Sequence, residues 1–282
     1  MSIVKINSII GGYRHTALFY GLSVLIPWLF WFGAGYVSHI TPYQGKYLNI
    51  ASVMAFAGLL SPVAVAYVLI SKNAALRKDV AGRFFNFREM KLRYVLLACL
   101  IMPTSILSAQ AVSLLFGYSP LQFVITGEYT FSSGIFPVSF LLVMAPVIEE
   151  LAWRSYGTDC LRRKFNLFNT SLIFGLFWGI WHLPLSAIRD YYQSNLLETG
   201  WIHSVNFLVS ILPYVILMNW LYYKTGRNIP VAIVFHITAG FFNEIFATHP
   251  DSKVIQTVLL LILAAYVVVR DKKLFFKREY EL

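Results

Sequence analysis

Long apolar runs recur along the chain and restrict its fold more than any other feature of the sequence. A run of about 20 apolar residues is long enough for a helix to cross the hydrocarbon core of a bilayer. We identify eight such runs, near residues 16–36, 49–70, 93–117, 134–157, 169–188, 203–223, 229–247 and 254–270. Since a helix satisfies its backbone hydrogen bonds internally in lipid, these runs predict an all-α polytopic membrane protein with about eight transmembrane helices.

The composition favours an integral membrane chain over a soluble domain. Charged residues make up 13% of the sequence and apolar residues 58%, whereas soluble domains are about a quarter charged. The first run is too long for the core of a signal peptide and no small-residue cleavage site follows it, so we expect it to remain as a helix. We find no internal repeat, low-complexity tract or flexible linker, so residues 1–282 are predicted to form a single domain of a multi-pass cell-membrane protein.

The net charge of +10 is distributed unevenly between the loops on the two sides of the predicted helices. When Lys and Arg are assigned to alternate loops, one side has 19 and the other has only Lys46, Arg189 and Lys253. The positive-inside rule then places both termini in the cytosol, and the basic side is expected to contact anionic membrane lipid rather than nucleic acid. The longest basic loop, residues 71–93, is interpreted either as a segment on the membrane surface or as an ordinary topology loop.

Three ionisable residues interrupt the fourth apolar run: Glu149, Glu150 and Arg154. Each costs roughly 2.5–3.5 kcal/mol at the centre of a membrane helix, and such residues usually face the interior of the bundle and mark function. Glu150 and Arg154 are four residues apart, so they share a helix face and can form an ion pair. Glu149 lies about 100° round the helix from Glu150, so it needs another partner. The alternative is that both glutamates hold Arg154.

Two histidines in other runs are candidate partners for Glu149. His182 lies in the fifth run and His236 in the seventh. With a rise of 1.5 Å per residue and the predicted topology, Glu149 and His236 lie at the same depth and His182 lies somewhat further from the cytosol. The three side chains are therefore expected to converge.

A glutamate and two histidines in a partly dry pocket suit hydrolysis without a covalent nucleophile. The carboxylate can act as general base to a water, one histidine can orient the base or the water, and the other can donate to an oxyanion. This mechanism requires no cofactor. The same ligand set, Glu149, His182 and His236, also suits a catalytic Zn²⁺, so a metal-dependent variant stays open.

Three segments, in order along the chain, resemble the motifs of the CPBP family, the CAAX-protease and bacteriocin-processing group also called Abi. "EELAWR" (149–154) is similar to its EExxxR motif, "WGIWHLP" (178–184) to its second motif with Trp178 in the place of Phe, and "HITAG" (236–240) to its HxxxN motif. The resemblance covers residues 134–247. It implies an eight-helix fold and, as in the family's characterised proteases, peptide-bond hydrolysis within the membrane.

The resemblance also implies a role for each matching residue. Glu149 would activate the water and His182 would help to hold it, Glu150 and Arg154 would support the first motif, and His236 would lie at the oxyanion. The third motif departs from the family pattern because Gly240 stands where Asn or Asp is usual. Asn243, about 10 Å further along the helix, could replace that donor only if the helix is distorted.

Three further residues carry structural expectations. Pro146 and Pro184 are predicted to bend their helices, although both could equally be packing kinks. Glu244 lies near the outer end of its run and is expected at the membrane interface.

We therefore interpret the chain as an intramembrane endopeptidase whose candidate catalytic residues are Glu149, Glu150, Arg154, His182, His236 and Asn243. Its substrate would be a membrane-associated peptide or protein. Two alternatives stay open: a non-catalytic membrane scaffold that binds a partner through the same cavity, and a proton-coupled transporter. The sequence does not define the oligomeric state or the identity of the substrate.

Overall fold

The structure is a computed structural model that describes residues 11–42, 44–86 and 90–277. In these ranges the regular structure is helical, apart from an isolated antiparallel bridge between Ile125 and Phe246. Every predicted run contains a helix: α2 (Thr16–Ser38), α3 (Gly45–Ser71), α5 (Leu92–Ser113), α6 (Val138–Ala152), α8 (Leu167–His182), α10 (Trp201–Lys224), α11 (Ile229–Ile245) and α12 (Pro250–Arg270). The prediction of an all-α polytopic membrane fold is confirmed.

Six of these helices are long and apolar enough to cross a membrane when α5 is counted with η1 (Leu114–Phe116) and α8 with η4 (Leu183–Ala187). The two exceptions are α6 and α11. Helix α11 is apolar but has only 17 residues. Helix α6 has 15 residues and continues through a π-helical turn, η3 (Trp153–Gly157), into α7 (Thr158–Arg162). Helices α6 and α11 carry the first and third motifs, so these two motifs lie on helices that are not among the six candidate spans.

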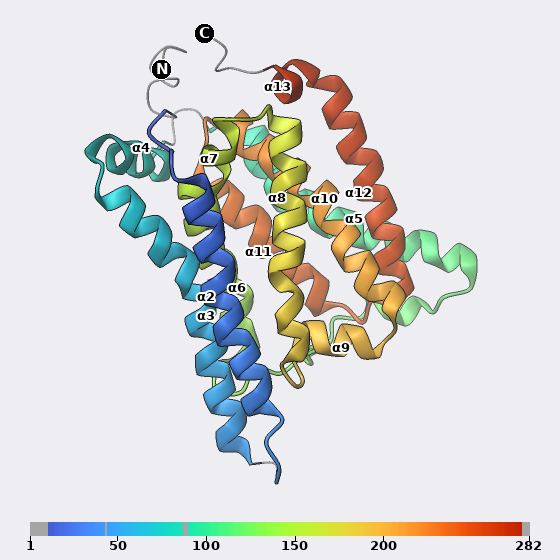
Figure 1. Cartoon of the computed structure of the whole chain (residues 1–282). Coiled ribbons are helices and arrows are strands. Elements are labelled where there is room, and N and C mark those ends of the chain that lie inside the picture. Colours follow the sequence, from blue (N-terminus) through green and yellow to red (C-terminus); the bar gives the residue numbers. More distant parts are fainter. Residues whose placement is uncertain (1–10, 43, 87–89, 278–282) are drawn as a thin grey trace.

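The helices surround α6 and α11, which pack against each other in the interior (Figure 1). Helices α2 and α3 form a hairpin that covers one side of this pair through α3, and α5 covers the other side through α11. Helices α8, α10 and α12 complete the bundle. Shorter elements connect them: α4 (Ala74–Phe84), η1 (Leu114–Phe116), η2 (Pro120–Phe123), η4 (Leu183–Ala187), α9 (Tyr192–Glu198) and α13 (Lys272–Phe276).

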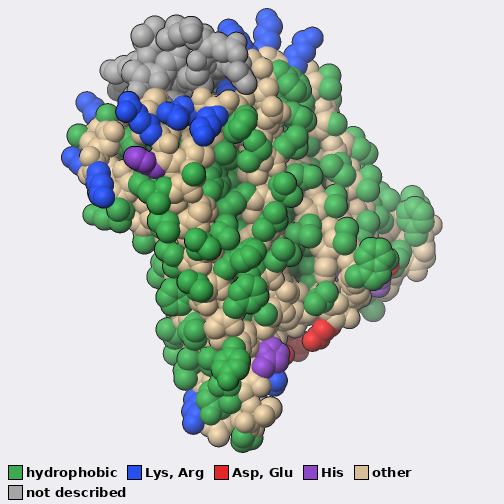
Figure 2. All heavy atoms as spheres, in the orientation of Figure 1, with side chains coloured by type: hydrophobic (Ala, Val, Ile, Leu, Met, Phe, Trp, Pro, Cys, Tyr) green, Lys and Arg blue, Asp and Glu red, His purple; other side chains and the backbone are tan. Residues whose placement is uncertain are grey.

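The surface has the charge pattern of a membrane protein. Figure 2 shows apolar side chains over the middle of the visible face and most of its Lys and Arg side chains near the end where α2 begins and α12 ends. Large apolar residues are exposed on outward helix faces, including Leu29, Leu100, Leu176 and Ile262. These residues are suited to contact lipid, because lipid tails impose no cost on exposed apolar side chains.

The two prolines that were predicted to bend helices lie at different places: Pro146 is inside a helix, and Pro184 lies just beyond the end of one. Helix α6 continues as a helix through Pro146. Helix α8 ends at His182, and Pro184 lies at the start of the 3-10 turn η4, so this proline follows the end of an α-helix instead of bending its middle. The departure from α geometry in the motif-bearing helix lies at η3, a π-helical turn that we did not predict.

The basic loop between α3 and α5 is more than a surface or topology segment. Part of it forms α4, and Asn73 caps the start of this helix, because its side chain accepts hydrogen bonds from the backbone N–H groups of Ala75 and Leu76. Leu76 and Arg83 of this helix are 2% and 3% exposed. Helix α4 is therefore docked into the protein, which neither interpretation of the loop anticipated.

Candidate active site

Glu149 lies on α6 and is held by two indole N–H groups. Its Oε2 accepts a hydrogen bond of 2.8 Å from Nε1 of Trp178 on α8 and a longer one of 3.4 Å from Nε1 of Trp153. The side chain is buried, with the whole residue 7% exposed. Both hydrogen bonds therefore fix the same oxygen of a carboxylate that is largely removed from solvent.

Glu150 connects α6 to α11. Its Oε2 accepts from Nε of Arg154 at 2.7 Å, and its Oε1 is paired with Nδ1 of His236 at 3.0 Å. The other donors of Arg154 bind Thr158, Asn219 and Met218. The predicted Glu150–Arg154 pair is present, and the alternative in which both glutamates hold Arg154 is wrong because Glu149 turns toward Trp178.

The hydrogen bonds of the two histidines define which ring nitrogen remains for a ligand. His182 Nδ1 lies 2.6 Å from the carbonyl oxygen of Trp178, so Nδ1 carries a proton and donates it. His236 Nδ1 faces the Glu150 carboxylate and likewise acts as the donor. Both rings therefore keep Nε2 for a ligand, and the Nε2 of His236 can donate only when that ring carries both protons.

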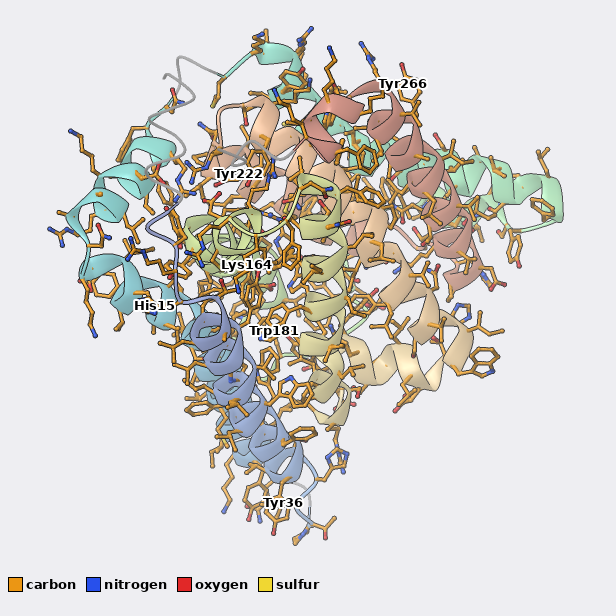
Figure 3. All side chains as sticks on the ribbon, turned by 45° about the horizontal axis from the view of Figure 1, so that its top comes forward. His15, Tyr36, Lys164, Trp181, Tyr222 and Tyr266 are labelled. Atoms are coloured by element: carbon orange, nitrogen blue, oxygen red, sulfur yellow. The ribbon has the colours of Figure 1, made fainter. Side chains whose placement is uncertain are left out.

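Trp178 is the residue around which these side chains meet. Its ring centroid lies 5.3 Å from that of His182 and 5.2 Å from that of His236, and its N–H binds Glu149. Trp181, also on α8 and labelled in Figure 3, packs against α2, with its ring centroid 4.5 Å from that of Trp31. Glu149, His182 and His236, which come from three separate helices, thus each contact the same indole ring.

A cavity of about 320 Å³ begins at this cluster. It extends from Glu149 toward the helix ends opposite the start of α2 and the end of α12. Its wall near the cluster includes Trp178, His182, Tyr214, His236 and Gly240. At the far end it includes Leu48, Phe131, Tyr192, His203 and Lys253. The cavity is mostly apolar and carries a few polar groups, which is typical of a ligand site.

Asn243 does not join the cluster. Gly240 and Asn243 both line the cavity, but the Asn243 amide donates to the hydroxyl of Tyr192 at 3.3 Å and to Oε1 of Glu244 at 3.0 Å. Helix α11 runs from Ile229 to Ile245 as an α-helix, without the distortion that would bring Asn243 back toward His236. A catalytic role for Asn243 stays a prediction that this geometry does not support.

Glu244, which the sequence places near the outer end of its helix, is buried inside the protein. The residue is 2% exposed. Its Oε2 accepts hydrogen bonds from the backbone N–H and the hydroxyl of Thr130, at 3.0 and 2.7 Å. Glu244 therefore binds the segment before α6 inside the protein, where paired backbone and hydroxyl donors offset the cost of burying a carboxylate.

The zinc ligand set considered above does not form a shared ligand position. Glu149, His182 and His236 are arranged around the ring of Trp178. In residues 11–42, 44–86 and 90–277, no group of three or more His, Cys, Asp and Glu side chains is placed to hold a metal ion. The residues present therefore do not fit a Zn²⁺ centre in this arrangement.

The π-helical turn η3 is held from outside by Arg83 of α4. Nη1 of Arg83 donates to the carbonyl oxygen of Arg154 at 2.6 Å, and Nη2 donates to that of Ser155 at 2.9 Å. The hydroxyl of Tyr222, labelled in Figure 3, also donates to the Arg154 carbonyl, at 3.1 Å. Single π turns inside α-helices are frequent at functional sites, and here the turn carries the arginine of the first motif.

Arg83 belongs to a buried cluster of charges at the basic end of the molecule. It pairs with Asp79 at 3.1 Å and with Asp159 at 2.7 Å, and Arg227 contacts the same two carboxylates at 3.1 and 2.5 Å. Burial raises the pKa of Asp79, but Arg83 and Arg227 outweigh that effect and hold the pKa below its usual value. The cluster joins α4 and α7 to the segment that follows α10.

The sequence did not reveal the contacts of three residues: Trp178, which donates to Glu149, Asn219, which accepts from Arg154, and Arg83, which binds η3. Trp178 was noticed only as a variant of a motif position, although an indole has an N–H that Phe lacks. Asn219 is an amide in an apolar helix, which is a signal for a buried polar contact. Arg83 gave no signal, because it is one of seven basic residues between residues 72 and 93.

Comparison with known proteins places this site in a family. Residues 130–242 match the family model "Type II CAAX prenyl endopeptidase Rce1-like". The chain is 36% identical to CAAX prenyl protease 2 of Methanococcus maripaludis over 272 residues, which are 95% of this chain and 99% of that protein. It is also 26% identical over 182 residues to lysostaphin resistance protein A of Staphylococcus haemolyticus, covering 64% of this chain and 46% of that protein.

The matched region contains all three motifs and the whole Trp178-centred cluster. The similarity to the archaeal protease extends over nearly the full length of both chains. The chain therefore belongs to the Rce1-like CAAX prenyl endopeptidases, the CPBP family of intramembrane proteases.

Proposed function

We propose that this protein hydrolyses a peptide bond of a membrane-associated substrate with a water that Glu149 activates. The hydrogen bonds of Glu149 and its place in the cavity wall support this proposal most directly. Its Oε2 is fixed by Trp178 and Trp153, and the residue lines a cavity that His182 and His236 also line. A carboxylate held by two N–H donors in a dry site is oriented to accept a proton from a water on its other oxygen.

The remaining residues would support the steps that follow. The water attacks the scissile carbonyl carbon and transfers a proton to Glu149, which forms a tetrahedral intermediate with a negatively charged oxygen. His236, protonated on both nitrogens and held by Glu150 at 3.0 Å, can donate from Nε2 to that oxygen. The intermediate collapses as the C–N bond breaks, and Glu149 returns the proton to the leaving amine. His182, fixed by the Trp178 carbonyl, can hold the water.

We further propose that the substrate ends in a prenylated CAAX-type segment, a lipid-modified cysteine followed by two aliphatic residues and a last residue. The similarity to a protein named CAAX prenyl protease 2 supports this choice. The apolar wall of the cavity supports it as well, because Phe56, Phe131 and Phe136 lie there. Aromatic side chains offer a large contact area to an apolar ligand.

The decisive experiment compares wild type with Glu149→Gln, which preserves the shape of the side chain but removes the base. A purified farnesylated CAAX-type peptide is incubated with each protein, and the products are identified by mass spectrometry. We expect kcat to fall by roughly 10²–10⁴ in the variant, the range for loss of a general base. Glu198→Gln, at an exposed position on α9, is the matched control and should leave kcat unchanged.

Comparison of peptide termini in membranes of the native host then identifies the natural substrate. Termini that are present with wild type and absent with Glu149→Gln would establish proteolysis. The scaffold alternative predicts identical termini for the two proteins and unchanged binding of a partner. The transporter alternative predicts pH-dependent flux that the substitution abolishes, with no new termini.

A further inference from the structure

Lys253 lies in the wall of the cavity at the end away from Glu149. It belongs to the first turn of α12, and the same face of that helix contributes Gln256, Thr257 and Leu260 to the cavity. Its Nζ donates to the carbonyl oxygen of Asn243 at 3.3 Å and lies 5.9 Å from the centre of the Tyr192 ring. The ammonium group is thus held at a defined place beside α9 and α11.

The charge of Lys253 is not neutralised by a carboxylate in the part of the chain that the structure describes, where no ion pair includes it. The acidic residues nearby are committed elsewhere. Glu244 binds Thr130 and Asn243, and Asp251 accepts a hydrogen bond of 2.6 Å from the hydroxyl of Tyr118. An ammonium group has three donors, and a cation beside a mostly apolar cavity favours an anionic ligand.

The distance of Lys253 from the proposed catalytic residues can be measured along α11. Its contact, Asn243, follows His236 by seven residues on the same helix. At 1.5 Å per residue this separation is about 10 Å along α11. An extended peptide advances about 3.3 Å per residue, so about three residues of substrate would reach from the scissile bond to the ammonium group.

We propose that Lys253 binds the free C-terminal carboxylate of the substrate and thereby selects peptides that end shortly after the scissile bond. The inference rests on the proposed function, because it assumes a peptide substrate in the same cavity. A carboxylate at this place forms a charge-assisted hydrogen bond with Nζ, and the Tyr192 ring keeps the ammonium group in position. Neither contact involves the groups that perform the hydrolysis.

The test compares two probes that differ only in the end group: a farnesylated CAAX-type peptide with a C-terminal carboxylate and the same peptide as a C-terminal amide. Their dissociation constants are measured with Glu149→Gln, which cannot turn them over, in lipid nanodiscs. The same measurement is repeated after adding Lys253→Met. We expect the acid to bind roughly ten- to a hundredfold more tightly than the amide, as for a hydrogen bond to a charged group, and Lys253→Met to abolish this preference.

Lys46→Met is the matched control. Lys46 is also a lysine beside a tyrosine ring, 5.1 Å from the centre of Tyr47, and lies at the same end of the bundle, but it is not part of the cavity wall. This variant should preserve the preference for the acid. Equal affinity for acid and amide in the Glu149→Gln background, or equal weakening of both by Lys253→Met, would overturn the inference.

Two further arms separate the remaining outcomes. Nanodiscs of phosphatidylcholine with and without phosphatidylglycerol distinguish a peptide carboxylate from a lipid phosphate. If Lys253→Met changes the effect of the anionic lipid but not the ratio of acid to amide, Lys253 binds lipid and the inference is wrong. Absence of cleavage by wild type, or cleavage that survives Glu149→Gln, contradicts the proposed function instead, and the binding ratio can still be read.

Discussion

Two adjacent glutamates have different surroundings because the side chains that contact them differ. Glu150 is enclosed by Arg154 and His236 and is fully buried, whereas Glu149 receives only indole N–H groups and lines the cavity. The 100° turn between consecutive helical residues directs the carboxylate of Glu150 into an ion pair and that of Glu149 toward the cavity. The contacts of each glutamate are therefore set by the helices that pack beside it.

Gly240 provides a test of what the third motif contributes. It lies four residues after His236 on α11, hence on the same face, and a Cβ there would meet only Leu142 Cδ2 at 3.6 Å, an ordinary contact. We expect Gly240→Asn to fold normally and to raise kcat by about tenfold, a fraction of the effect of one oxyanion donor. Peptide hydrolysis at saturating substrate measures the change.

Gly240→Ala is the control for that prediction, because Ala also removes the conformational freedom of Gly in a helix but brings no amide. Only Asn should increase kcat relative to Ala. If the two variants hydrolyse the peptide equally fast, the position does not supply a donor to the intermediate.

For individual residues, the sequence predicted contacts within one helix but not contacts between helices. The Glu150–Arg154 pair follows from a spacing of four residues. The bond from Trp178 to Glu149 depends on how α8 is rotated against α6, which packing of the whole bundle determines. The contacts of Asn243 were likewise hidden, since its partner Tyr192 lies on α9, an element that we did not predict.

The π-helical turn η3 is the element on which the first motif depends. It lies between α6 and α7, so the extra residue in its turn sets the rotation of α7 relative to the glutamates. Arg83 binds the carbonyl oxygens of two of its residues. Helix α4, outside the membrane spans, thereby contacts the backbone beneath the active site.

We expect Arg83→Lys to lower both stability and kcat, because a single ammonium group cannot replace a planar guanidinium that serves five acceptors. The loss of stability should approach the 3–5 kcal/mol typical of a broken buried ion pair. Thermal unfolding in detergent and peptide hydrolysis by the folded fraction measure the two effects. Arg77→Lys, on the exposed side of α4, is the control. A lowered melting temperature with unchanged kcat would show that η3 does not need Arg83 to position the motif.

The ion pairs of Asp79 with Arg83 and Arg227 allow us to predict how the stability of the protein depends on pH. Its pKa is held below the usual value of 3.8 by Arg83 and Arg227 despite burial. The native state therefore binds fewer protons than the unfolded state, so the stabilisation is present above about pH 4 and is lost as pH falls through the lower native pKa. The difference in melting temperature between wild type and Asp79→Asn should be constant above that pH and shrink below it. A difference that does not change with pH would assign the stability to packing alone.

For the whole molecule, the apolar runs predicted the helices more completely than the sequence predicted the contacts within the site. Apolar runs gave a helix at each predicted place, since a membrane requires long apolar helices. They could not reveal that α6 and α11 are short, because loops and helix ends are equally apolar there. Nor could they show that the cavity extends from Glu149 away from the end that holds the buried charge cluster.

The orientation of the protein in the membrane determines which side the cavity faces, and it can be measured directly. The predicted placement of both termini in the cytosol puts Lys46 outside the cell and Lys272 in the cytosol, because α3 begins at the end of the bundle opposite α13. We expect Lys46→Cys to react with a membrane-impermeant maleimide in intact cells and Lys272→Cys to react only after permeabilisation, with wild type measuring the background of Cys99 and Cys160. The cavity extends from Glu149 toward the Lys46 end, so this result would direct the substrate's C-terminus outward across the membrane. The reverse labelling would contradict the charge assignment and open the cavity toward the cytosol, where a modified protein could enter it directly.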